Sequence, residues 1–353
     1  MSTTLFEPIT LRSLTVPNRI WMDAMCQAGA APEGERAGVP DDWHFAHLAA
    51  RATGGAGLIL SKATAVSPEN RLGPYDLGIW NDTQVEAFRR ITAFLKSQGT
   101  VPGVQLAAGR GEPAGGGWVD RRFPVTPGKR YGWAPGGSGT VPFAAGSTAV
   151  EELGTEQIGR VVADFADAAG RALDAGFQVA EIHGVHGYLV NQFLSPHSNH
   201  RTDGYGGDFM GRTRFALEVV EAVRAVWPQD LPVFFRMSSA DGPGESGGDC
   251  EGWTADDTVR LAKELQARGV DLMDVPAPRH RVPVAERVRD ETGMPVAAVG
   301  PLTGPARAQA LLRSGGADAV LLGQELLRDP YWPLHAASAL GGRVNTPVLY
   351  HVA

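Results

Sequence analysis

Three side chains that can bind an oxygen atom or donate a proton lie in one short segment: His183, His186 and Tyr188. Gly184 and Gly187 stand between them and permit a tight backbone turn. Two imidazole N–H groups can polarise a carbonyl or nitro oxygen, and they stabilise it more as it gains negative charge. A tyrosine hydroxyl, with a pKa of about 10, can supply a proton. The segment therefore predicts acid/base chemistry on a polarised substrate.

Two other interpretations of the histidines exist. They could be loop residues whose polar groups are satisfied locally, or they could be a pair of metal ligands. The sequence offers no recognisable third ligand for a metal ion. We therefore predict catalytic roles for His183, His186 and Tyr188, and no metal.

The segment follows a short apolar strand, and seven similar stretches alternate with helical patterns elsewhere in the chain. Short continuous runs of Val, Ile, Leu and Ala indicate strands that are buried on both faces, as in a parallel sheet. The predicted strands are Ile20–Met25, Gly57–Ala63, Gly103–Leu106, Gln178–Ile182, Val233–Met237, Leu272–Val275, Val296–Val299 and Ala319–Leu322. The predicted helices are Asp41–Ala52, Asp82–Gly99, Thr155–Ala175, Arg212–Trp227, Thr254–Arg268, Val284–Thr292, Ala306–Arg313 and Trp332–Leu340.

Eight strands alternating with eight helices predict a single-domain (β/α)₈ barrel over residues 1–353, with its active residues at the carboxyl ends of the strands. Residues 5–19 suit a hairpin cap, and the Gly- and Pro-rich stretch 109–149 after the third strand suits a long lid loop. An open doubly wound sheet is the competing fold, and it favours a glycine-rich turn after the first strand. One G-x-G-x-x-G does occur, at Gly242, Gly244 and Gly247, but it leads into more loop instead of a helix.

Composition narrows the class of protein. The net charge of −7 and the isoelectric point near 5.7 argue against nucleic acid or an anionic membrane as the main partner. Two cysteines imply no disulfide framework and favour a reducing compartment. The sequence contains no apolar run of the ~18 residues that a membrane-spanning helix needs. We therefore expect a soluble cytoplasmic protein with a small-molecule substrate.

If the barrel is right, the strand ends converge on one pocket. Gln105 and Arg236 could bind a planar heterocycle there, because a carboxamide and a guanidinium match ring carbonyl and nitrogen edges. Cys26 by itself is typical of a buried, unreactive thiol. The full set of strand-end residues is Met25, Cys26, Lys62, Ala63, Gln105, His183, Arg236, Asp274, Val275, Gly300, Gly323 and Gln324.

The run EIHGVHGYLVNQFLSPHSNHRTDGYGG at 181–207 resembles the signature of the old yellow enzyme family of FMN-dependent oxidoreductases. Further blocks along the chain also resemble that family, and Cys26 resembles its thermophilic-like bacterial branch. These blocks are LFEPITLRSLTVPNRIWMDAMC at 5–26, DLGIW at 76–80, VQLAAGR at 104–110, FFRMS at 234–238, GVDLMDV at 269–275 and ELLRDPYW at 325–332.

The resemblance implies FMN at the strand carboxyl ends and hydride transfer from NAD(P)H, through the flavin, to an activated alkene. It implies that His183 and His186 hold the substrate's electron-withdrawing oxygen while Tyr188 protonates the α-carbon. The residues expected at the cofactor are Met25, Cys26, Ala63, Gln105, Arg236, Gly300, Gly323 and Gln324. A homodimer or homotetramer is also possible.

The chain departs from the family pattern chiefly where the FMN phosphate is expected. Pro276-Ala277-Pro278 stands in place of a Ser/Gly-rich turn, and Gln324 in place of an arginine. Ala107 and Ala108 stand where the family has a histidine, and Ala28 where this branch often has a pocket tyrosine. The chain ends PVLYHVA, without the arginine that related dimers insert into a neighbouring site.

Our prediction is an ene-reductase-like oxidoreductase acting on an α,β-unsaturated carbonyl compound with NAD(P)H. The altered phosphate site motivates an alternative: a non-redox isomerase or cyclase on the same barrel, with His183, His186 and Tyr188 as acid and base and with FMN lost or weakly bound. A binding or scaffold protein derived from an enzyme and a metal hydrolase are further alternatives.

Overall fold

Eight parallel strands form a closed barrel in the computed structural model, which describes residues 4–71, 73–109, 136–139, 151–239, 252–276, 283–300 and 302–350. The strands are β3 (Ile20–Met22), β4 (Leu58–Ala65), β6 (Val101–Ala107), β9 (Val179–Gly184), β10 (Val233–Met237), β11 (Leu272–Pro276), β12 (Val296–Val299) and β13 (Ala319–Leu322). They pair in the order β3-β13-β12-β11-β10-β9-β6-β4, and the pairing of β3 with β4 closes the barrel. The predicted (β/α)₈ barrel is confirmed.

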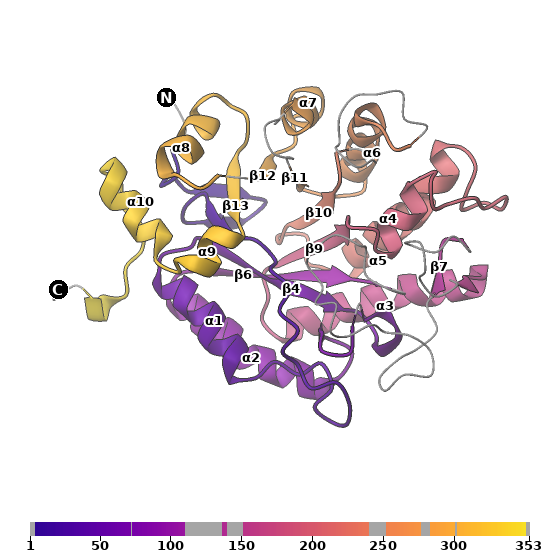
Figure 1. The fold of residues 1–353 in the computed structure, drawn as a ribbon, viewed down its shortest axis with the longest axis horizontal. Helices are drawn as coiled ribbons and strands as arrows, with labels where there is room; N and C mark the ends of the chain where they lie inside the picture. The colour runs from indigo at the N-terminus through magenta and orange to yellow at the C-terminus, as the bar shows by residue number, and fades with distance from the viewer. Residues whose placement is uncertain are drawn as a thin grey trace.

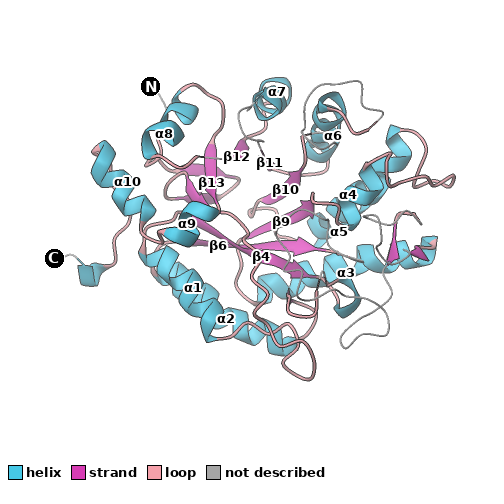
Figure 2. Cartoon of the chain, in the orientation of Figure 1, coloured by secondary structure: helices cyan, strands magenta, loops and turns pink. Residues whose placement is uncertain are grey.

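A ring of helices surrounds the strands (Figures 1 and 2). Its main helices are α1 (Asp42–Thr53), α2 (Asp82–Ser97), α3 (Thr155–Asp174), α5 (Phe209–Val226), α6 (Ala255–Ala267), α7 (Pro283–Thr292), α8 (Pro305–Arg313) and α10 (Trp332–Leu340). The sequence prediction missed α4 (Leu189–Leu194) and α9 (Gln324–Arg328), which are too short for a helical period to show.

Side chains cap two of the helices at their amino-terminal ends. Asn81 caps α2, because the Asn81 side chain accepts a hydrogen bond from the Gln84 backbone N–H at 3.1 Å. Thr254 and Asp257 form a capping box at α6, in which each side chain accepts a hydrogen bond from the backbone N–H of the other residue. These caps set where the two helices start.

The inward side chains of the barrel change character along the strands. Near the amino-terminal ends they are apolar, and Trp21 and Phe234 stack there with ring centroids 5.8 Å apart. Because side chains alternate between the two faces of a strand, the next inward positions are Asp23 and Arg236. The barrel therefore has an apolar floor with a layer of charged side chains above it.

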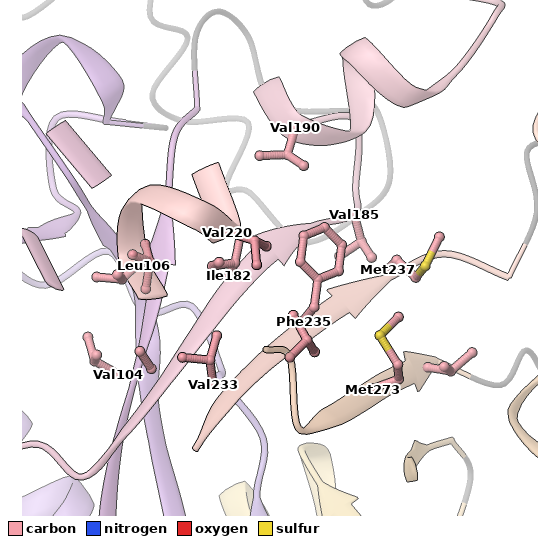
Figure 3. Packing of buried hydrophobic residues seen from close by; sticks show 14 of the residues in the cluster. Val104, Leu106, Ile182, Val185, Val190, Val220, Val233, Phe235, Met237 and Met273 are labelled. Carbon is pink, nitrogen blue, oxygen red and sulfur yellow. The ribbon is translucent and has the colours of Figure 1, made fainter. Parts of the chain in front are cut away.

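The opposite faces of the same strands pack under the helices. A larger hydrophobic core lies between the strands and the helices (Figure 3). Its fully buried residues include Val104 and Leu106 on β6, Ile182 on β9 and Phe235 on β10. This packing is mainly apolar and holds the strands against the helices, while the inner face remains available for polar residues.

A hairpin closes the amino-terminal end of the barrel, as predicted. Its strands β1 (Ile9–Leu11) and β2 (Leu14–Val16) pair antiparallel, and Leu11 and Leu14 join the apolar floor. Arg12 ties the hairpin to the barrel because its Nε lies 2.6 Å from Asp271 Oδ1. Solvent therefore reaches the barrel interior from the carboxyl-terminal end of the strands.

Several sequence features lie outside the described residues. These are Trp118, Trp133, Cys250, the glycines at 242, 244 and 247, and most of the predicted lid 109–149. Of that segment, the structure describes Gly109 and residues 136–139, where the short strand β7 (Gly136–Gly137) pairs with β8 (Glu151–Glu152). No helix in the described part of the chain is long and apolar enough to cross a membrane.

Candidate active site

The turn after β9 is built to present its side chains at the barrel mouth. His186 has a φ of 62° and Gly187 a φ of 72°, both in the left-handed region, which a histidine adopts at a cost and a glycine freely. Two residues of α4 brace the turn: Asn191 Oδ1 accepts from the Gly187 N–H at 2.8 Å, and Gln192 Nε2 donates to the Gly187 carbonyl at 2.9 Å. A strained conformation held in this way is typical of a functional site.

The three predicted catalytic side chains meet in space. Ring centroids are 4.7 Å apart for His183 and Tyr188, 5.3 Å for His183 and His186, and 6.0 Å for His186 and Tyr188. His183 and Tyr188 are buried, whereas His186 is exposed at the mouth. The His183 ring nitrogens make no hydrogen bond of good geometry to a described residue, although one of them faces the Val185 backbone. The other nitrogen is therefore available to a ligand.

The surrounding protein keeps all three side chains uncharged near neutral pH, including that of His186, which is desolvated on the side that faces the barrel. Desolvation lowers the pKa of His183 well below its usual value, and the neighbouring His186 and Arg236 lower it further. Desolvation, with a contribution from Arg236, also lowers the pKa of His186 to about 4. Desolvation raises the pKa of Tyr188 above its ordinary value. The site thus holds neutral N–H and O–H donors and not ions.

Arg236 lies at the centre of a charged layer and is the register partner of His183. Its guanidinium forms a bidentate pair with Asp23, in which Nη2 lies 3.3 Å from Asp23 Oδ2 and Nη1 contacts the other oxygen. Nη1 also lies 3.3 Å from Asp274 Oδ2. Burial lowers the pKa of Arg236, but the nearby acidic groups, Asp23 most of all, raise it above its ordinary value, so the guanidinium remains charged. Its Nε is buried without a hydrogen-bond partner among the described residues.

Gln105 and Glu181 complete this layer from the neighbouring strands β6 and β9. Gln105 Nε2 donates to Glu181 Oε1 at 2.7 Å, and both side chains are almost fully buried. Desolvation raises the pKa of Glu181 to about 7, although Arg236 and Gln105 oppose the shift. The hydrogen bond fixes the carboxamide of Gln105 and leaves its oxygen for another donor.

The end of β3 lies beside β13. A Cβ atom on Gly323 would lie 2.6 Å from Met25 Sδ, so Met25 packs closely against the backbone at the end of β13. The predicted burial of Cys26 is wrong, because its side chain is exposed to the mouth. Enough protein still surrounds the thiol that desolvation raises its pKa to about 11, and Asp76 adds to the shift. Cys26 is therefore a neutral thiol near pH 7.

A β-bulge in β4 decides which side chains the second barrel strand presents to the barrel interior. The register shifts between Leu60 and Ala63, so Lys62 turns away from the barrel axis, and its Nζ reaches the carbonyls of Gln27 and Tyr75. Ala63 instead packs with Ala107 and Tyr188 in a small apolar cluster. These two alanines form a flat apolar wall beside the tyrosine.

The remaining predicted cofactor residues lie on adjacent strands at the same end of the barrel. Gly300 follows β12, Gly323 follows β13, and Gln324 begins α9 with an exposed side chain. Pro276 ends β11, while Ala277 and Pro278 lie outside the described residues. Among the described residues, no cluster of three or more His, Cys, Asp or Glu side chains could hold a metal ion.

The sequence analysis missed Asp23 and did not assign Glu181. The two-residue period of a strand could have identified both residues. Asp23 lies two residues after the inward Trp21, and Glu181 lies two residues after the inward Val179. The same spacing leads from Phe234 to Arg236. A charged residue at an inward strand position is unusual enough to mark a site.

The whole chain is similar to proteins of one family. A model of the NADH:flavin oxidoreductase / NADH oxidase family matches residues 4–341. The chain belongs to this family. It is 41% identical over 362 residues to an NADPH dehydrogenase of Geobacillus thermodenitrificans strain NG80-2, covering 99% of this chain and 98% of the relative. An NADPH dehydrogenase of Geobacillus sp. strain WCH70 is 40% identical over 362 residues, with the same coverage.

Solved structures agree. The fold superposes on morphinone reductase in complex with tetrahydroNAD with a TM-score of 0.80 and 29% identity, covering 98% of this chain and 93% of the other. This family member is therefore a flavin-dependent NAD(P)H oxidoreductase, and its cofactor is FMN. The predicted family, enzyme class and cofactor are confirmed.

The donor set of this oxidoreductase fits a flavin ring. The unpartnered Nε of Arg236 and the open oxygen of Gln105 suit the polar edge of such a ring. The wall of Ala63 and Ala107 suits its apolar portion. Gly300, Gly323 and Gln324 could hold the phosphate, since they follow directly after the paired strands β12 and β13.

Proposed function

We propose that this oxidoreductase reduces the activated C=C bond of an α,β-unsaturated carbonyl compound, with NAD(P)H as the reductant. The observation that supports the proposal most is the meeting of His183, His186 and Tyr188 as neutral donors with a His183 nitrogen available to a ligand. A carbonyl oxygen requires N–H donors, and neutral imidazoles supply them.

In the proposed reaction, His183 and His186 donate hydrogen bonds to the carbonyl oxygen and draw electron density toward it. This polarisation leaves the β-carbon electron-poor and stabilises the negative charge that gathers on the oxygen. FMN, when bound and reduced by NAD(P)H, would supply the hydride that the β-carbon accepts. Tyr188 donates its hydroxyl proton to the α-carbon, and water returns a proton to the phenolate.

The position of Tyr188 favours this role. Tyr188 occupies the N-cap position of α4, and its side chain packs beside Ala63 and Ala107. Its raised pKa keeps the hydroxyl protonated. Membership in an oxidoreductase family whose relatives are NADPH dehydrogenases favours the redox reaction over a non-redox isomerase or cyclase.

Tyr188→Phe tests the proposal, because it removes only the hydroxyl. We expect reduction of 2-cyclohexenone to slow by about 10²- to 10⁴-fold, the usual contribution of a positioned acid. Bleaching of the flavin by NADPH should be unchanged, since that step does not use Tyr188. Stopped-flow absorbance separates the two steps.

Two results would contradict the proposal. If NADPH bleaches the flavin of the wild-type protein but no enone reoxidises that flavin, the proposed substrate class is wrong. If Tyr188→Phe reduces the enone at the wild-type rate, another group donates the proton.

A further inference from the structure

A layer of buried charge adjoins His183, whose register partner on the next strand is Arg236, and it exceeds what binding a ring edge requires. Asp23, Glu181, Arg236 and Asp274 come from β3, β9, β10 and β11, and none has more than 5% of its surface exposed. The three carboxyl groups face a single guanidinium. Buried charges are costly unless they are paired, so the way in which they pair is informative.

Asp23 reaches Arg236 across the interior of the barrel. From β3 to β10 there are four strand steps in either direction around the closed sheet, so the two strands lie on opposite sides. Asp23 is itself held in place, since its Oδ1 accepts from the Ala24 N–H at 2.7 Å. It then binds both terminal nitrogens of the guanidinium. A bidentate pair fixes the plane of the guanidinium as well as its position.

Asp274 plays a different part in the same layer. It is fully buried, and neither of its oxygens makes a hydrogen bond to a described residue. Desolvation raises its pKa well above the usual range, despite the opposing effect of Arg236. Asp274 therefore tends to hold a proton, and Asp23 is the carboxylate that faces the guanidinium as a charged, hydrogen-bonded partner.

The charge that Arg236 presents to the mouth matters for a flavin. Two-electron reduction adds negative charge to the ring system, so a nearby cation favours the reduced form and a carboxylate bound to that cation opposes it. In a site with little water, the net charge of the pair counts more than in bulk solvent.

We propose that Asp23 is a positioning residue that acts through Arg236: it orients the guanidinium beneath the flavin ring and offsets its charge, which keeps the bound flavin a strong hydride donor. The inference rests on FMN as the cofactor and on Arg236 facing its ring. It does not depend on which alkene is reduced.

Asp23→Asn tests the inference, because it preserves the shape of the side chain and removes its charge. We expect reduced FMN to bind about tenfold more tightly relative to oxidised FMN, which for a two-electron couple is a midpoint potential about 30 mV more positive. Reductive titration with a reference dye measures the potential of the purified holoprotein. The dissociation constants of oxidised FMN and the thermal unfolding of the flavin-free protein are measured alongside.

Two matched variants separate charge from shape. Asp23→Glu retains the charge, and its potential should remain near that of the wild type. Asp274→Asn removes a carboxyl group from the same layer, and it should shift the potential much less, because that group already tends to hold a proton.

An unchanged potential in Asp23→Asn, or an equal shift in Asp23→Glu, would overturn the inference. So would an Asp23→Asn protein that does not fold, because the carboxylate would then serve the barrel and not the flavin. A wild-type protein that shows the shift in its variants but reduces no enone would overturn the proposed function and leave this inference standing.

Discussion

At the scale of single residues, burial decides the chemistry more than residue type does. Two histidines that titrate near pH 6.5 in water are kept neutral here, and a glutamate is shifted to a pKa of about 7. The sequence indicated His183, His186 and Tyr188 as candidate catalytic residues from their types and spacing. It could not predict their protonation states, because desolvation depends on every group that surrounds them in the folded chain.

The stability of the flavin-free protein should depend on pH through His183. Its pKa is lowered on folding, so below about pH 6.5 the unfolded chain binds more protons than the native one. The free energy of unfolding therefore falls as the pH falls from 6.5 toward 4. Glu181 acts in the opposite sense, because its raised pKa makes stability fall as the pH rises from 4.5 toward 7.

Comparing the wild type with His183→Gln isolates the contribution of His183 to this pH dependence. Urea unfolding of the wild type and of His183→Gln at pH 7.5 and pH 5.5 should show that the variant loses less stability on acidification. Equal losses in the two proteins would mean that His183 does not carry this linkage.

Substitution of Gln324 tests the altered phosphate site. The resemblance to the old yellow enzyme family predicts an arginine at this position, and its charge-assisted hydrogen bond to the phosphate would contribute about 1.5–3 kcal/mol. Gln324→Arg should therefore tighten FMN binding about 10-fold or more, as measured by quenching of flavin fluorescence. Arg328→Gln, on the same short helix and exposed, controls for net charge. If the affinity of Gln324→Arg is unchanged, another cation already binds the phosphate.

At the scale of elements, β9 and β10 must approach closely for His183 and Arg236, which are register partners, to lie side by side. A Cβ on Gly184 would lie 2.9 Å from the Arg236 carbonyl oxygen and 2.9 Å from the Phe235 ring. Gly184→Ala should cost about 1–3 kcal/mol of stability, because both neighbours are packed and cannot give way. Chemical denaturation measures the loss, and enone reduction should also slow as His183 moves.

Gly159 on α3 is the matched control for Gly184. It is exposed, and a Cβ there would meet nothing within 4 Å. Gly159→Ala should instead stabilise the protein by about 0.5–1 kcal/mol, since alanine is the better helix former. Equal effects of the two substitutions would refute the steric argument.

At the scale of the whole molecule, the barrel separates stability from chemistry along its axis. Trp21 and Phe234 fill the floor, whereas the reactive groups lie at the opposite end of the strands. Phe234→Ala should lower the free energy of unfolding by about 3–5 kcal/mol by opening a cavity, as measured by urea titration.

The charged layer lies between that cavity and the mouth, so the visible spectrum of bound flavin at low temperature should persist in Phe234→Ala. Leu349→Ala, at a side chain that is 85% exposed, should change stability by less than about 0.5 kcal/mol. Loss of flavin from folded Phe234→Ala would show that the two ends of the barrel are coupled.

The sequence by itself determined the barrel, and it indicated the segment that we propose carries the chemistry. Both follow from local patterns: apolar runs that alternate with helical periods, and two histidines and a tyrosine spaced by glycines after a strand. The boundaries of the eight predicted helices followed to within three residues, whereas the short α4 and α9 were missed.

Only the tertiary structure decided what meets inside the barrel. Asp23 and Arg236 are 213 residues apart, and they pair because closure places their strands opposite each other. The bulge in β4 turned Lys62 away from the site, and the end of β3 left Cys26 exposed where burial was predicted. Such contacts depend on register and closure, which are set by packing summed over all eight strands and are not encoded in any one segment.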